Sequence, residues 1–135
     1  MTGRGNAPAL GMQHDAGSAV AEFALVAALV SLMFASVLQL GYALHVHNTA
    51  TAHAIEGARE GARLGNTSEQ GVARTLELLE TTLPGTYGTT VSAQRITVAG
   101  VEVVEVTATL PVPLLGPLGP PGAMTVTGQA FAEDQ

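Results

Sequence analysis

Residues 23–44 read FALVAALVSLMFASVLQLGYAL, a run of 22 residues without a formal charge. As an α-helix rising about 1.5 Å per residue it would extend roughly 33 Å, enough to cross a bilayer core of about 30 Å. Its clearly polar side chains are Ser31, Ser36 and Gln39, and Tyr42 stands where an interfacial aromatic is expected. The pattern predicts a transmembrane helix. The alternative is a buried core helix, but so small a chain has little other apolar sequence to cover one.

The composition of the whole chain supports a small membrane-tethered domain. The 135 residues are 47% hydrophobic and only 12% charged, and five arginines against eleven acidic residues give a net charge of 5 − 11 = −6. An acidic chain without lysine argues against binding nucleic acid through its phosphates. The absence of cysteine excludes disulfides, thiolate nucleophiles and cysteine-based zinc sites.

The segment before the apolar run differs from it. Residues 1–17 read MTGRGNAPALGMQHDAG, a mixture of glycine, proline and polar residues without a period, which predicts no regular structure. Arg4 precedes the run whereas Arg59 and Arg63 follow it, so the distribution of positive charge does not fix the orientation in the membrane.

Glu22 lies at the edge of the apolar run, where an unpaired carboxylate is costly to bury. A functional role is therefore expected, and the alternative is that the side chain reaches up to the lipid headgroups. The preceding residues, Gly17-Ser18-Ala19-Val20-Ala21, and the following Phe23 complete a motif.

This motif resembles the processing site of type IV pilins and pseudopilins, in which a prepilin peptidase cuts after a glycine just before the hydrophobic helix. The resemblance implies a cut between Gly17 and Ser18 and makes Glu22 the fifth residue of the mature chain, where it can pair with a new α-amino group. The mature chain would have 135 − 17 = 118 residues, and its net charge would stay at −6 because Arg4 and Asp15 leave together.

The helix is expected to continue beyond the membrane. Residues 45–64 read HVHNTATAHAIEGAREGARL, with glycines spaced by four at Gly57, Gly61 and Gly65. Because each glycine in a helix costs about 1 kcal/mol relative to alanine, this spacing predicts a face that another helix approaches closely. The alternative is a helix weakened and partly frayed by its glycines. Alanines share the same spacing: Ala54, Ala58 and Ala62.

These residues carry a second resemblance. The chain is similar to the TadE-like family of Flp-type (tight-adherence) pilus assembly proteins through Glu22-Phe23, Gly41-Tyr42-Ala43-Leu44, Asn48 and the stretch AREGAR over residues 58–63. The resemblance covers roughly residues 17–64. It implies as partners a prepilin peptidase, other pilins or pseudopilins, and an assembly platform in the inner membrane.

The C-terminal part predicts a second helix and a sheet. Thr67 and Gln70 fit a capping box, so a helix is expected from Ser68 to the Pro84-Gly85 pair. Its core-facing stripe is expected to be Val72, Leu76, Leu79 and Leu83. Strands are expected over residues 89–98, 101–112 and 124–132, with a turn at Ala99-Gly100 and a proline-rich loop over residues 111–122.

We therefore expect an α+β fold: a long N-terminal transmembrane helix, continuing into an extracytoplasmic helix, an amphipathic helix and a small three-stranded antiparallel sheet packed on Leu76 and Leu79. Tyr87 and Phe131 would be its aromatic residues outside the membrane region, so the core is expected to be thin. The expected division is a leader at residues 1–17, a transmembrane helix at residues 18–45 and an extracytoplasmic domain at residues 46–135.

We predict no catalytic site, cofactor or metal. His45 and His47 point to different helix faces, and Glu102 and Glu105 are expected on opposite faces of a strand, both solvated. The predicted function is a minor pilin or pseudopilin of a Flp-type pilus, in the inner membrane or in the pilus. The alternative is an unprocessed, single-pass membrane-anchored binding module.

Overall fold

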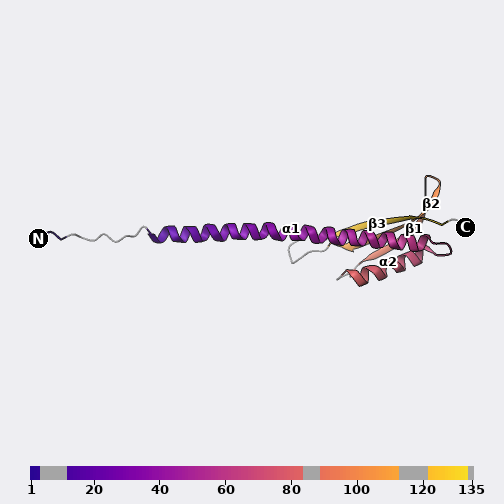
Figure 1. Cartoon of the computed structure of the whole chain (residues 1–135), viewed down its shortest axis with the longest axis horizontal. Coiled ribbons are helices and arrows are strands. Elements are labelled where there is room, and N and C mark those ends of the chain that lie inside the picture. Colours follow the sequence, from indigo (N-terminus) through magenta and orange to yellow (C-terminus); the bar gives the residue numbers. More distant parts are fainter. Residues whose placement is uncertain (4–11, 84–88, 113–121, 134–135) are drawn as a thin grey trace. The chain divides into compact units, whose positions relative to one another are not determined.

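The computed structural model of the chain describes residues 1–3, 12–83, 89–112 and 122–133. Within them the order of elements is α1 (Met12–Ala62), α2 (Ser68–Thr82), β1 (Thr90–Val98), β2 (Val101–Pro111) and β3 (Ala123–Phe131) (Figure 1). This confirms the α+β fold. The expectation that residues 1–17 lack regular structure is wrong for residues 12–17, because α1 already begins at Met12.

The chain divides into two compact units, residues 1–38 and residues 39–135, and α1 contributes to both. In the first unit the helix is apolar and uncovered: from Gly17 to Leu38 every residue except Ala27 is exposed. The helix is long and apolar enough to cross a membrane. No described residue covers this segment, an arrangement compatible with a single-pass membrane anchor.

The second unit contains the predicted sheet. β1, β2 and β3 are antiparallel in that order, and each strand begins and ends within one residue of its prediction. Val98 pairs with Val101 across a two-residue turn, in which Ala99 and Gly100 both have positive φ, 51° and 84°. Positive φ at both positions is the geometry of a type I′ hairpin turn, so the turn at Ala99-Gly100 is confirmed.

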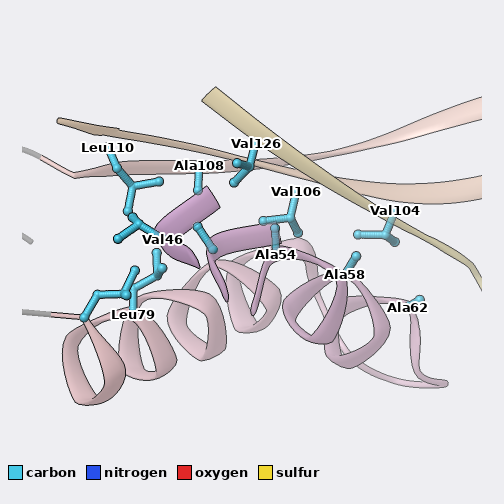
Figure 2. Close-up of a cluster of buried hydrophobic side chains, with 12 residues drawn as sticks. Val46, Ala54, Ala58, Ala62, Leu79, Val104, Val106, Ala108, Leu110 and Val126 are labelled. Carbon is cyan, nitrogen blue, oxygen red and sulfur yellow. The ribbon is translucent and has the colours of Figure 1, made fainter. Parts of the chain in front are cut away.

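The core lies between the sheet and the second half of α1 (Figure 2). β2 contributes alternate residues, as expected of a strand with one buried face. α1 contributes a residue every fourth position, which places them on one helix face. The buried residues of α1 are Val46, Ala50, Ala54, Ala58 and Ala62; those opposite are Val104, Val106, Ala108, Leu110, Val126 and Leu79.

The start of α2 follows its prediction, and the Thr67 backbone N–H donates to Gln70 Oε1 at 2.8 Å. The predicted stripe is only partly right. Leu79 and Leu83 are buried, but Val72 and Leu76 are half-buried, and the buried positions of the first two turns are Gly71 and Thr75. The stripe rotates because α2 turns its small residues toward α1.

Aromatic residues add little to the core. Phe131 is 72% exposed, so it adds little bulk to the domain interior. Tyr42, expected at the membrane interface, is half-buried and packs against the core cluster. Tyr87, Pro84-Gly85 and most of the proline-rich loop lie outside the described residues.

Candidate functional site

Gly17, Ser18, Glu22 and Phe23 all lie in α1 and are all exposed. Ser18 and Glu22 are one helical turn apart, and Ser18 Oγ donates to Glu22 Oε1 at 3.3 Å. The carboxylate therefore reaches back to the residue that would become the N-terminus after a cut at Gly17. Phe23, 75% exposed, begins the uncovered apolar surface beside it.

The described residues do not require a glycine at position 17. A Cβ added there would meet no atom within 4 Å, and its φ lies outside the left-handed region. Neither crowding nor backbone conformation requires glycine at this position, in contrast to the glycines of the second unit.

Gly57 and Gly61 pack against a helix of the same chain. A Cβ at Gly57 would lie 2.6 Å from the Gly71 carbonyl oxygen and would also collide with Thr75 Oγ1. A Cβ at Gly61 would lie 3.3 Å from the Thr67 carbonyl oxygen. Both glycines are buried, and the helix backbone that approaches them is α2.

Gly65 does not extend this face. α1 ends at Ala62, and Gly65 is exposed with φ of 81° and no atom within 4 Å of an added Cβ. Its glycine permits the left-handed turn between α1 and α2. The spacing of four is therefore a coincidence at this third position.

The backbone of β3 comes close to α1 at Gly128, a contact that the sequence analysis does not predict. A Cβ there would lie 2.5 Å from the Ala54 carbonyl oxygen, so the β3 backbone rests directly on α1. A glycine within a strand pattern signals such an approach, and Gly128 stands between the apolar Val126 and Ala130.

The C-terminal end of α1 is held by residues from the sheet and the tail. Arg95 Nη2 donates to the Gly61 and Asn66 carbonyl oxygens at 3.3 and 3.1 Å, while Nη1 pairs with Glu102 Oε1 at 2.6 Å. The Glu133 N–H donates to the Ala62 carbonyl oxygen at 2.9 Å, and Glu133 Oε2 accepts from the Leu64 N–H at 3.2 Å. These contacts satisfy backbone groups that a helix end leaves unpaired.

Glu102 and Glu105, expected to be merely solvated, each have side-chain partners. Glu102 pairs with Arg95, and Glu105 accepts hydrogen bonds from Gln129 Nε2 at 2.6 Å and Gln94 Nε2 at 2.9 Å. The bonds from Gln129 and Gln94 lower the pKa of the Glu105 carboxyl below its usual value. The row joins all three strands across one face of the sheet.

The histidines with described side chains are His45, His47 and His53, all in α1. His53 Nε2 lies 2.6 Å from Thr82 Oγ1, at the end of α2, and burial together with the positive charge of Arg74 lowers its pKa below 6.5. His45 and His47 are both exposed. Among the described residues no group of three His, Asp or Glu side chains is placed to hold a metal ion.

Residues 17–63 match the family model described as TadE-like protein. The match confirms the resemblance of this segment to the TadE-like family and indicates a part in the assembly of Flp-type (Tad) pili. It begins at Gly17 and ends one residue beyond α1. No curated protein and no solved structure matches the chain.

Proposed function

We propose that this chain, TadE-like over residues 17–63, is a minor pilin or pseudopilin of a Flp-type pilus, with a structural role and no enzymatic one. A prepilin peptidase removes residues 1–17. The helix over residues 18–45 then holds the protein in the inner membrane, and residues 46–135 form an extracytoplasmic domain that meets other pilins and the assembly platform.

The observation that carries this proposal is the position of Glu22. Its exposed carboxylate stands just before the apolar segment of α1 over residues 23–38, which no described residue covers, and it already contacts the Ser18 side chain at 3.3 Å. A cut at Gly17 would give Ser18 an α-amino group one helical turn away. A carboxylate at the membrane edge is stabilised by such a cation, from its own chain or from a neighbour.

Gly17 also fits a processing site. The Gly17-Ser18 bond lies inside α1, so a peptidase must open the helix locally before cutting it. Glycine lowers the cost of that opening by about 1 kcal/mol relative to alanine. The packing of the described residues offers no other reason for glycine here.

Intact-mass measurement tests the proposal. The full chain is expressed with a prepilin peptidase, extracted from the membrane and weighed, and we expect a chain that begins at Ser18. Omitting the peptidase is the control and should give the full-length mass. A full-length chain in the presence of active peptidase would instead support the unprocessed membrane-anchored module.

The role of Glu22 needs a separate measurement. We expect Glu22→Gln to leave membrane insertion unchanged and to reduce co-purification with other pilins, because the amide leaves a partner's amine unpaired. If that pair is buried, the loss is about 3–5 kcal/mol. Wild-type yield of the partners would show that Glu22 only reaches the headgroups.

A further inference from the structure

The face of the sheet turned away from α1 changes character along its length. Its middle is the row Gln94, Glu105 and Gln129, held by hydrogen bonds. Toward one end the register brings together hydroxyl side chains such as Thr107 and Thr127. Toward the β1–β2 turn it brings together apolar ones, here called the hairpin-end patch: Ile96, Val98, Val101, Val103 and Phe131.

Phe131 makes this patch unusual. Phe131 is the phenylalanine that lies outside the apolar segment of α1, and it is 72% exposed at the end of β3 while the core cluster consists of alanine, valine and leucine. Val98 and Val101 beside the turn are 47% and 44% exposed. An exposed aromatic ring among exposed valines is typical of a protein contact surface.

The patch contains the exposed Phe131 ring and, beside it, an apolar pocket. A pocket of about 250 Å³ lies next to the Phe131 ring and is lined by Val98, Val103, Gln129 and Ala130. Val103 is only 4% exposed. A projecting ring beside an apolar pocket is self-complementary: under a two-fold axis each ring can enter the pocket of the other copy.

The charges around the patch favour a second copy. The chain carries −6 overall, but the hairpin-end patch itself contains no charged residue, and the Arg95–Glu102 pair lies on the opposite face of the sheet, toward α1. Two copies that meet at the patch therefore bring no like charges together at its centre. Glu105 bounds the contact, because an extension over the whole face would bring two carboxylates together.

We propose that the hairpin-end patch is a self-association surface, at which two copies of this chain pair about a two-fold axis with Phe131 of each in the pocket beside Val103 of the other. The inference does not depend on processing at Gly17. It concerns the folded domain and is separate from any contact between copies through the apolar segment of α1.

Single-cysteine crosslinking tests this surface directly, because the natural chain has no cysteine. The full-length chain in lipid vesicles carries Val101→Cys, or Thr127→Cys as the matched control on the polar end of the same face. After mild oxidation we expect disulfide-linked dimers from the Val101 variant, at least fivefold more than from the control. Adding Phe131→Ser should reduce the Val101 dimer to the level of the control, and Val98→Glu provides a second disrupting change.

Equal crosslinking at the two positions would overturn the proposal, since association through the membrane helix alone brings the domains together without selecting the patch. Dimers that persist with Phe131→Ser and with Val98→Glu, in variants that melt like the wild type, would also overturn it. In cells, adducts of Val101→Cys with another protein in place of dimers would identify a different partner and reject a second copy.

Discussion

Two segments of α1 are both apolar but differ in the size and exposure of their side chains. Over residues 23–38 large side chains such as Phe23 and Phe34 surround the helix and are exposed, 75% and 63%. Over residues 46–62 one valine and four alanines at four-residue spacing are at most 5% exposed. The first segment has a large exposed apolar surface and no protein neighbour among the described residues. The second segment has small side chains that pack against the sheet and α2.

Side-chain size accounts for the difference. Alanine and glycine remove little apolar area from water, but they let the backbones of β3 and α2 come close to α1, as at Ala54 and Gly57. Leucine and phenylalanine prevent such an approach. They suit a lipid surrounding, where a large apolar surface is favourable and no other backbone needs to come close. One continuous helix can therefore serve a bilayer and a protein core by changing residue size along its length.

The largest effect should come from enlarging a glycine in the small-residue segment. We expect Gly57→Leu to destabilise the domain by roughly 3 kcal/mol or more, because the new side chain meets the Gly71 backbone and Thr75. Thermal unfolding followed by circular dichroism in micelles measures this. Gly41→Leu, on the same helix with no atom within 4 Å of a Cβ, is the control and should leave the domain as stable or slightly more so. Equal losses would mean that helix contacts are not the cause.

Replacing one leucine by alanine in the core and one in the apolar segment of α1 tests whether only the core contributes to the stability of the domain. Leu79→Ala leaves a cavity in the core and should cost about 2–5 kcal/mol of unfolding free energy. Leu32→Ala, at a position 62% exposed, should leave the unfolding of the domain unchanged. Urea denaturation of both variants in micelles compares them. A matching loss for Leu32 would show that the apolar segment is a part of the folded core.

The smallest effect concerns the polar contact between α1 and α2. Because the folded state lowers the pKa of His53 below 6.5, it favours the neutral ring. The stability that His53 contributes is thus fully present above the unfolded value and is lost as the pH falls through it toward the folded value. Arg74, the charge on α2 that helps to lower this pKa, pairs with Glu77 at 2.9 Å.

The melting temperature of the wild type should therefore fall more between about pH 7.5 and pH 5 than that of His53→Gln. His45→Gln, which changes an exposed ring, should behave like the wild type. Identical pH profiles for His53→Gln and wild type would assign the whole pH dependence to the carboxylates.

The sequence was sufficient wherever a local pattern determines the structure. The strands alternate, Thr67 with Gln70 marks a helix start, and Ala99-Gly100 fits a two-residue turn, so these elements were predicted within a residue. The motif from Gly17 to Phe23 was visible for the same reason, and the family match begins there.

The sequence is insufficient where the structure depends on which of several elements packs against a residue. The spacing of Gly57 and Gly61 predicts a close helix but does not say which one, and the structure supplies α2 of the same chain. The burial of Thr75 ahead of Leu76 follows from that contact, not from hydrophobicity. Phe131 is apolar and lies in a strand, yet its place at the sheet end leaves it exposed, which no periodicity reveals.

The contact between the chain's tail and α1 also sets an order of events during synthesis. Glu133 and Leu64 are 69 residues apart, and Gly128 meets Ala54 across a similar separation, so neither contact can form until residues 128 and 133 have been made. Until then the alanine face of α1 has no sheet to cover it. Non-local closure of this kind is slow relative to helix formation. The apolar segment is thus translated, and can enter the bilayer, well before the domain that follows it folds.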